Sequence, residues 1–302
     1  MNTQRGIVLS PADLDGLEWP AILIDAGLNL LGLHSDQLTA EQRRTVDRCV
    51  ARGIDVEYHL HLSPRFMNAE LFAARPEYFS MDILGQRAEE ANVCVSSPGL
   101  LDLARESARQ CVANAPATTH RYHLWAGDNR HWCNCEQCAA YSPSDQNVML
   151  MHAFVDGARL ADPQATVAYL AYLETLPAPA GVQPRPEVFL EFAPYRRNFM
   201  QPIEATACDA NRKHVAALDA LLAVFPARDA CVLEYWLDVS YWSNYQKDAS
   251  KPTVTEAMLV SDIAFYVGRG FTSIASFACR MNEAYFSRFG DGLLAAFGRG
   301  CL

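Results

Sequence analysis

The chain has 302 residues, half of them hydrophobic, which is enough for the large buried core of one α/β barrel. Its formal net charge of −10 argues against nucleic acid and anionic membranes as partners of the surface as a whole. No run approaches the roughly 18 apolar residues of a membrane span, and no signal peptide is visible, so we expect a cytoplasmic protein.

Short β-rich runs alternate with amphipathic stretches in chain order. We predict strands over residues 6–10, 28–34, 54–62, 121–127, 166–174, 187–194, 231–238 and 272–278. We predict helices over residues 35–53, 99–114, 145–160, 211–225, 255–269 and 291–298. This alternation predicts an α/β fold, a single (β/α)8 barrel domain over residues 1–302. A doubly wound sheet would more naturally carry a Gly-rich phosphate turn after its first strand, and "SPADLDG" lacks that pattern.

Polar and aromatic residues follow most of the predicted strands. In a barrel, the loops at the carboxyl ends of the strands build the active site. The residues at these ends are Asp13, His34, His59, His61, Asp128, Asn129, Arg130, His131, Tyr172, Glu174, Tyr195, Arg196, Arg197, Tyr235, Trp236, Asp238, Arg280, Asn282 and Glu283. Flat rings beside carboxylates suit sugars, because the rings stack on the sugar face and the carboxylates bind its hydroxyls. We therefore expect a carbohydrate substrate, and a glycoside hydrolysis that needs an acid and a base but no cofactor.

Several motifs resemble those of a poorly characterised family of bacterial barrels. They are "PEYFSMDILGQR", "NVCVSSPGLLDLA", "GDNRHWCNCEQC", "YLAYLETLPAP", "FAPYRRNF", "CDANRKHVAALDALL" and "EYWLDVSYWSNY". That family lies among glycoside hydrolases, near the α-glucuronidases and β-N-acetylhexosaminidases, and the resemblance covers roughly residues 60–290. It implies a barrel fold and glycosidase activity.

The segment "AGDN" also resembles the Gly-Gly-Asp-Glu turn that ends strand four of β-N-acetylhexosaminidases. In that family the Asp orients the substrate acetamide and the Glu is the general acid. Asp128 matches the Asp, but Asn129 stands where the Glu would be, and an amide cannot donate the proton. The resemblance therefore implies that the proton comes from elsewhere.

A second resemblance supplies a proton donor. The order of Asp13 after strand one and His131 after strand four is similar to an inverting barrel sialidase family that pairs a His acid with an Asp base. It implies a single displacement in which His131 protonates the leaving oxygen and Asp13 activates water. The competing assignment makes Glu174 the acid and His131 a ligand of a sugar hydroxyl.

An acidic sugar, sialic or uronic, also needs a cation for its carboxylate. Arginine binds a carboxylate with two parallel hydrogen bonds, so we expect Arg196 to serve, with Arg197, Arg130, Arg87 and Arg280 as other candidates. The predicted catalytic set is Asp13, Asp128, His131 and Glu174. The predicted substrate-binding set is His61, Asn129, Tyr172, Arg196, Tyr235, Trp236 and Asn282.

Ten cysteines are present, and three of them cluster in "CNCEQC" as Cys133, Cys135 and Cys138. Closed structural zinc sites need four ligands. This motif supplies three, and the candidates for the fourth are Cys94 and Cys279. A disulfide in the loop and free thiols are the alternatives. Three classes of function stay open. The first is a glycosidase, either exo-acting on acidic sugars or N-acetylhexosaminidase-like. The second is a non-catalytic carbohydrate-binding barrel, and the third is a module built around the thiols.

Overall fold

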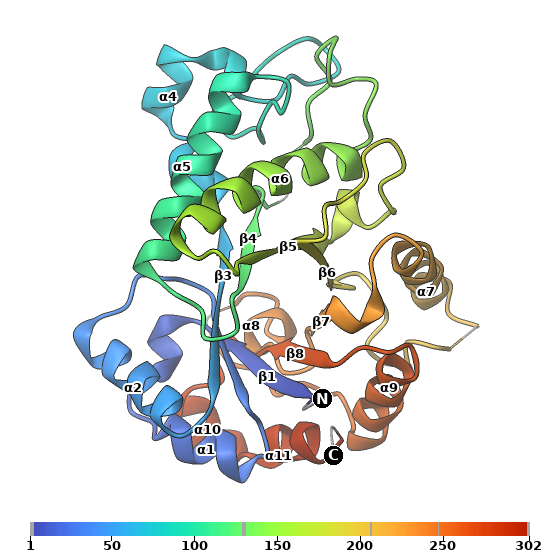
Figure 1. Ribbon diagram of the computed structural model, residues 1–302. Helices are drawn as coiled ribbons and strands as arrows, with labels where there is room; N and C mark the ends of the chain where they lie inside the picture. Colours follow the sequence, from blue (N-terminus) through green and yellow to red (C-terminus); the bar gives the residue numbers. More distant parts are fainter. Residues whose placement is uncertain (1–2, 129–130, 206, 247, 301–302) are drawn as a thin grey trace.

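The computed structural model describes residues 3–128, 131–205, 207–246 and 248–300. Eight parallel strands close into a barrel in chain order, and β8 pairs with β1 (Figure 1). The strands are β1 Gln4–Leu9, β2 Leu30–Leu33, β3 Asp55–His61, β4 Arg121–Trp125, β5 Thr166–Ala171, β6 Val188–Phe192, β7 Cys231–Glu234 and β8 Ser273–Phe277. The predicted single (β/α)8 barrel fold is therefore confirmed.

Helices follow seven of the eight strands. They are α1 Trp19–Asp25, α2 Ala40–Ala51, α3 Ser63–Phe66, α4 Ala69–Ala74, α5 Pro98–Asn114, α6 Pro143–Ala161, α7 Asp209–Leu222, α8 Val239–Trp242, α9 Glu256–Gly268, α10 Glu283–Phe289 and α11 Gly292–Gly300. Residues 172–187, which join β5 to β6 and are all described, contain only the 3-10 turn Leu173–Thr175. That side of the barrel mouth is therefore framed by a loop.

The strands alternate between side chains that face the helices and side chains that face the barrel interior. On β3, Glu57, His59 and His61 share the interior face. Gly32 on β2 makes room for them, since a Cβ at this position would lie 2.8 Å from Nε2 of His59. The middle of this barrel is therefore occupied by polar rings and carboxylates in place of the branched aliphatic residues that usually fill it.

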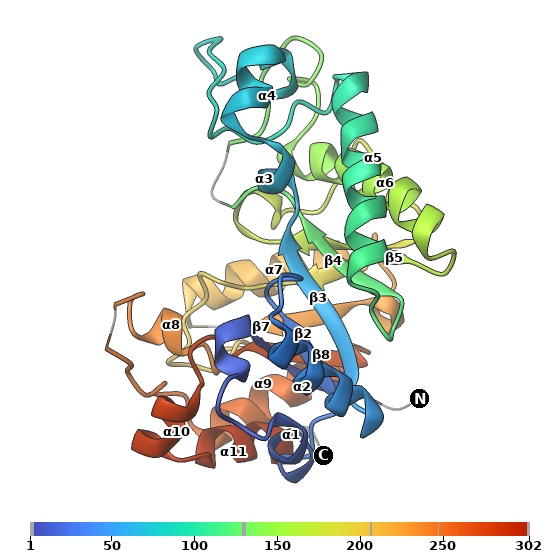
Figure 2. The same cartoon turned by 90° about the vertical axis from the view of Figure 1, so that its left-hand side faces the viewer.

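The longest excursion from the barrel follows β3 and carries α3 and α4. In Figures 1 and 2 this segment lies beyond the strands at the same end of the molecule as the start of α5, and α5 packs along α6. The two helices approach closely at Gly157, where a Cβ would lie 1.9 Å from the carbonyl oxygen of Arg105. This helix pair supports the loops that follow β3 and β4.

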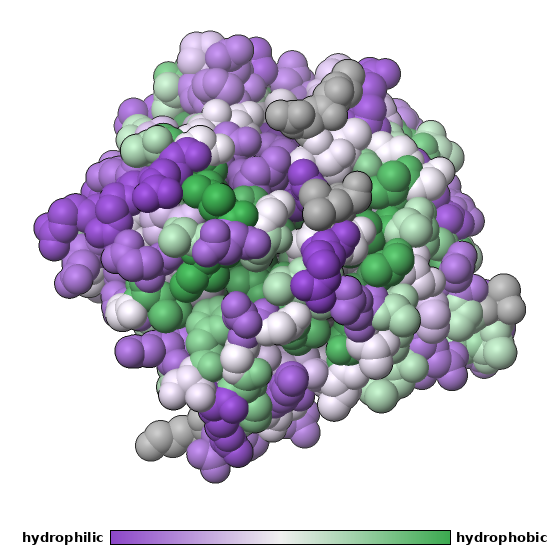
Figure 3. All heavy atoms as spheres, turned by 90° about the horizontal axis from the view of Figure 1, so that it is seen from below, coloured by the Kyte–Doolittle hydropathy of each residue, from purple (hydrophilic) through white to green (hydrophobic). Residues whose placement is uncertain are grey.

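The opposite end of the molecule carries α1, α10 and α11. Figure 3 looks at this end and shows apolar side chains grouped within a largely polar surface. A hollow of about 370 Å³ lies between these helices and is lined by Leu17, Ile22, Phe286 and Leu294 among others. Within the described residues, no helix has the length and apolarity needed to cross a membrane.

Candidate active site

A cavity of about 1000 Å³ opens at the carboxyl ends of the strands, and a smaller one of about 280 Å³ adjoins it. The residues that line both are His61, Trp125, Asp128, Leu170, Tyr172 and Tyr195. They come from the ends of β3, β4, β5 and β6. The two hollows therefore form one site at the end of the barrel where the sequence predicts it.

The floor of the site is aromatic. Trp125 lines both hollows and packs against His61, with ring centroids 5.0 Å apart. His61 is oriented by a 2.7 Å hydrogen bond from Nδ1 to the carbonyl oxygen of Ala126. His34 lines the smaller hollow, and burial together with the charge of His61 lowers its pKa to about 4. Near neutral pH, His34 is therefore an uncharged ring.

A buried layer of charged residues lies directly beneath this floor. His123 donates through Nε2 to Glu57 over 3.0 Å, and its Nδ1 lies 2.8 Å from Glu191. Glu191 in turn accepts a 2.7 Å hydrogen bond from Nε1 of Trp125. The ring of His59 stacks on that of His123 at 3.8 Å. The layer therefore fixes Trp125, the central ring of the cavity floor, from below.

The protonation of this layer follows from its pairing. Burial alone would lower the pKa of His123, but the charges of Glu191 and Glu57 and the hydrogen bonds to them raise it to about 9. Burial works against ionisation of Glu57 too, yet the hydrogen bond and the charge of His123 hold its pKa at about 2. Burial lowers the pKa of His59, which stays neutral. The layer is thus a carboxylate–imidazolium–carboxylate chain.

One side of the site is a group of tyrosines. Tyr195 lies 5.4 Å from Tyr172 and 5.2 Å from Tyr235, measured between ring centroids. Its hydroxyl is 3.0 Å from that of Tyr245. Tyr172 lines both hollows and Tyr235 the smaller one, so these two predicted ligands face the site. Such rings offer apolar faces and hydroxyl groups to a sugar.

Two carboxyl groups face the smaller hollow from different strands. Asp128 follows β4 and hydrogen-bonds Tyr172, and Asp238 follows β7. Asp238 accepts hydrogen bonds from the backbone and hydroxyl of Ser240. Burial and, more weakly, the charge of Asp13 nevertheless raise the pKa of Asp238 to about 6. Asp238 can therefore exchange a proton close to neutral pH.

Asp13 lies at the same end of the barrel, but it is 3% exposed and is not among the residues that line either hollow. Its Oδ2 accepts hydrogen bonds from the backbone of Ser10 at 3.1 Å and of Arg280 at 2.9 Å. Asn282, a predicted substrate ligand, also hydrogen-bonds Asp13 and caps α10 through a bond from Tyr285. Both residues tie the loops after β1 and β8 together.

The larger hollow collects the other predicted acid–base groups. His131 and Glu174 line it from the loops after β4 and β5, and Arg196 lines it from the loop after β6. Arg196 is exposed and, among the described residues, forms no ion pair with a carboxylate. Asn129 and Arg130 lie outside the described residues.

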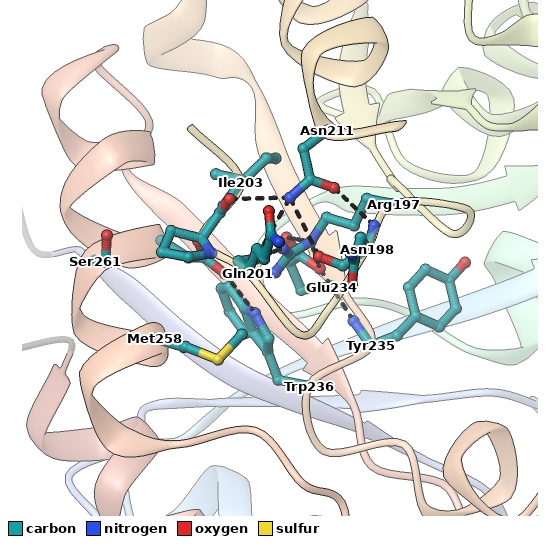
Figure 4. Close-up of polar contacts among 12 residues, drawn as sticks. Arg197, Asn198, Gln201, Ile203, Asn211, Glu234, Tyr235, Trp236, Met258 and Ser261 are labelled. Atoms are coloured by element: carbon teal, nitrogen blue, oxygen red, sulfur yellow. Dashed lines mark hydrogen bonds and ion pairs between the residues drawn. The ribbon is translucent and has the colours of Figure 1, made fainter. Parts of the chain in front are cut away.

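Arg197 does not reach the site. Its side chain is fully buried between Glu234 and Asp262, with Nε 3.0 Å from Glu234, and Figure 4 shows it pointing into this network. Trp236 is fully buried in the same region and donates to Asp262 over 3.1 Å, so its predicted role in substrate binding is wrong. Arg87 also lies elsewhere, hydrogen-bonded to Cys94 and to the carbonyl oxygen of Phe79.

Four residues of α7 line the larger hollow and were not predicted from the sequence: Asp209, Ala210, Lys213 and His214. They are presented by the side of a helix, so no strand-end rule points to them. Trp125 was also missed, although it is the last residue of β4. Its place in a strand whose alternate residues are Arg121 and His123 is a signal that could have found it.

The cysteine cluster gains its fourth member from the loop after β3. Sulfur atoms of Cys94, Cys133, Cys135 and Cys138 all lie within 4.8 Å of one another, and all four residues are buried. Cys279, the other candidate, lies two residues after β8, with its sulfur 4.0 Å from the carbonyl oxygen of Val8. No described cysteine forms a disulfide. The cluster offers four soft ligands to a metal.

Comparisons with known proteins place this geometry in context. Among solved structures, a β-galactosidase from the psychrophilic Marinomonas ef1 superposes with a TM-score of 0.54 at 10% identity, over 90% of this chain and 53% of its own. A class V chitinase from Nicotiana tobaccum superposes with a TM-score of 0.51 at 10% identity, over 100% of this chain and 99% of its own. The chain thus spans about half the length of the β-galactosidase, and the likeness shows a shared barrel fold.

A search of curated proteins found no match. The profile described as "Domain of unknown function (DUF4838)" matches residues 35–226, which include His61, Asp128, Arg196 and the four clustered cysteines. Because the match extends over more than half of the sequence, the chain belongs to the DUF4838 family.

Proposed function

We propose that the protein is a glycoside hydrolase whose substrate is a sugar that carries a carboxylate. The observation that carries the proposal is the site itself: two adjoining hollows at the carboxyl ends of the strands combine a tryptophan floor, a tyrosine wall, carboxyl groups and cationic side chains. Rings that stack on a sugar and carboxyls that transfer protons are the two requirements of glycoside hydrolysis. The barrel fold shared with a β-galactosidase and a chitinase agrees with it.

We assign the proton donor to Asp238. A carboxyl group whose pKa is raised to about 6 keeps its proton at mildly acidic pH and can give it to the leaving oxygen. Asp128, which faces the same hollow from β4, then serves as the base that takes a proton from the attacking water. The reaction is still the single displacement that the sialidase resemblance implies. The acid is now Asp238 in place of His131, and the base is Asp128 in place of Asp13.

The earlier assignment of Asp13 as base and His131 as acid is the alternative. The carboxylate of Asp13 is engaged by two backbone amides and by Asn282, and it does not line the hollow. Its negative charge instead contributes to the raised pKa of Asp238. We therefore give Asp13 a positioning role. His131 and Glu174, which line the larger hollow, become ligands of sugar hydroxyls.

The preference for an acidic sugar rests on Arg196 and Lys213. Both line the larger hollow, and among the described residues neither forms an ion pair with a carboxylate. The nearby Asp209 is already paired with Arg212. Two cations that pair with no carboxylate in the described part of the chain, in a protein of net charge −10, favour a substrate that brings its own negative charge.

The test is a screen of aryl glycosides of sialic acid, glucuronic acid and N-acetylhexosamine, followed by variants. Asp238→Asn should lower kcat on a poor leaving group by about 100-fold or more, and a very good leaving group should restore most of it. Asp128→Asn should show no such rescue. Activity of the wild type should fall as pH rises through about 6, because the donor loses its proton.

Other outcomes would overturn parts of the proposal. If a very good leaving group restores the activity of His131→Ala and not that of Asp238→Asn, the acid is His131, as the sialidase resemblance implies. A retained anomer in the first-formed product, seen by NMR, would exclude single displacement. Sugar binding by calorimetry without turnover on any aryl glycoside would identify a carbohydrate-binding barrel. Equal activity on acidic and neutral glycosides would remove the role of Arg196 and Lys213.

A further inference from the structure

We propose that Cys94, Cys133, Cys135 and Cys138 bind a structural zinc ion that joins the loop after β3 to the loop after β4. The sulfur of Cys94 lies 3.7 Å from that of Cys135 and 3.9 Å from that of Cys138. A tetrahedral zinc site with Zn–S bonds of about 2.3 Å has sulfur–sulfur edges of about 3.8 Å. A disulfide would require about 2.05 Å. The sulfur atoms are therefore spaced for a metal ion and not for a bond to one another.

Donor groups surround the sulfur atoms as they do around thiolates. The backbone amides of Met81 and Cys135 donate to Sγ of Cys133 at 3.3 and 3.5 Å. The hydroxyl of Ser96 lies 3.2 Å from Sγ of Cys94 and 3.5 Å from Sγ of Cys135. Four thiolates around Zn²⁺ leave two negative charges, and the guanidinium of Arg87, hydrogen-bonded to Cys94, offsets part of them.

The backbone around the cluster has little regular structure of its own. Residues 79–97 contain only two isolated antiparallel bridges, Phe79 to Val93 and Met81 to Arg87. Irregular stretches of this length are uncommon in compact domains unless they are functional. Because buried metal ligation fixes such loops, a zinc ion explains why this stretch packs against residues 133–138 with all four cysteines buried.

The cluster also borders the proposed active site. His131 and Trp132 line the larger hollow and immediately precede Cys133. The hydroxyl of Ser80 donates to the carbonyl oxygen of His131, and the amide of Asn134 donates to Met81. Four protein ligands leave no open position for water, so this ion is structural and takes no part in hydrolysis. Its role for the site is to hold the wall formed by His131 and Trp132.

Metal analysis of the intact chain tests the proposal. Protein expressed in unsupplemented medium, and purified with a reductant but no chelator, should contain about one zinc per chain. Inductively coupled plasma mass spectrometry measures this content. Cys135→Ser and Cys94→Ser should lower the zinc content to a small fraction of that value. Cys208→Ser is the matched control, because Cys208 lies at the start of α7 outside the cluster, and it should keep the full content.

Cobalt provides a measurement that does not depend on how the variants fold. Co²⁺ exchanged into the wild-type protein should give the intense sulfur-to-metal and tetrahedral ligand-field bands of a four-thiolate site. Metal-free protein with all thiols titratable, a disulfide within the cluster, or iron in place of zinc would each overturn the zinc assignment. None of these readouts uses activity. The proposed hydrolase function can therefore fail while the zinc site stands, and the reverse.

Discussion

Replacing Arg197 by Met tests the buried ion network that separates this arginine from its neighbour Arg196. Arg197 pairs with Glu234 and Asp262, and all three side chains are fully buried. It also donates to the carbonyl oxygen of Gln201 at 3.3 Å and stacks 4.4 Å over the ring of Phe199. Methionine keeps much of the side-chain length but leaves two buried carboxyl groups without their cation.

The magnitude follows from this arrangement. Removal of one partner from a buried ion pair costs about 3–5 kcal/mol, because the remaining charge is neither paired nor solvated. Tyr266 and Trp236 still donate to Glu234 and Asp262, at 2.6 and 3.1 Å, so we expect the lower half of that range. Chemical denaturation followed by tryptophan fluorescence should show a loss of roughly 3–4 kcal/mol in the free energy of unfolding.

The matched control is Arg196→Met, one residue earlier in the chain. Arg196 is exposed and lines the larger hollow, so its replacement should change the free energy of unfolding by no more than about 0.5 kcal/mol. It should instead raise KM for an acidic glycoside. Equal losses of stability in the two variants, or a loss below about 1 kcal/mol for Arg197→Met, would refute the argument that burial separates their roles.

Two further predictions concern the barrel interior and the helix pair. The pKa of His123 is about 9 in the folded chain and about 6.5 when unfolded, so its contribution to stability is complete below pH 6.5 and is lost as pH rises through 9. His123→Gln should flatten that alkaline decrease in urea titrations, and an undiminished decrease would contradict the assignment. Gly157→Ala should lower the free energy of unfolding by about 1–3 kcal/mol, because its Cβ would meet the backbone of Arg105. Gly268→Ala, whose Cβ would meet nothing within 4 Å, is the control and should be neutral or slightly stabilising.

The strands of this fold could be predicted because their periodicity is local. The helices were harder where their signals are short or depend on tertiary packing. The predicted helix over 35–53 begins later, at Ala40, because Thr39 and Gln42 form a capping box. No helix is predicted over α1, because its seven residues are too few for a clear period and the residue before them, Glu18, makes no side-chain cap. The predicted strand over 166–174 ends at Ala171, just before Leu173 turns the backbone with a φ of 47°.

For the site, the sequence predicts the contributing loops more accurately than it predicts the individual side chains that face the hollows. Tyr235 and Trp236 are neighbours in the turn just after β7, but Tyr235 lines the smaller hollow whereas Trp236 is buried beside Asp262. The same distinction separates Arg196 from Arg197. Lys213 and His214 could not be foreseen, because the packing of α7 against the barrel, and not any local pattern, brings them to the hollow.

The charged layer inside the barrel is explained by its contact with the site above it. Burying Glu57, His123 and Glu191 costs more free energy than filling the same space with aliphatic side chains. The layer instead gives Trp125 a fixed acceptor in Glu191, 2.7 Å from its indole nitrogen, so the ring on which a sugar would stack cannot rotate freely. Because His123 holds both carboxylates ionised, the layer supplies no proton to the hollow. The pH dependence of turnover near 6 should therefore come from Asp238, and the alkaline loss of stability should come from His123.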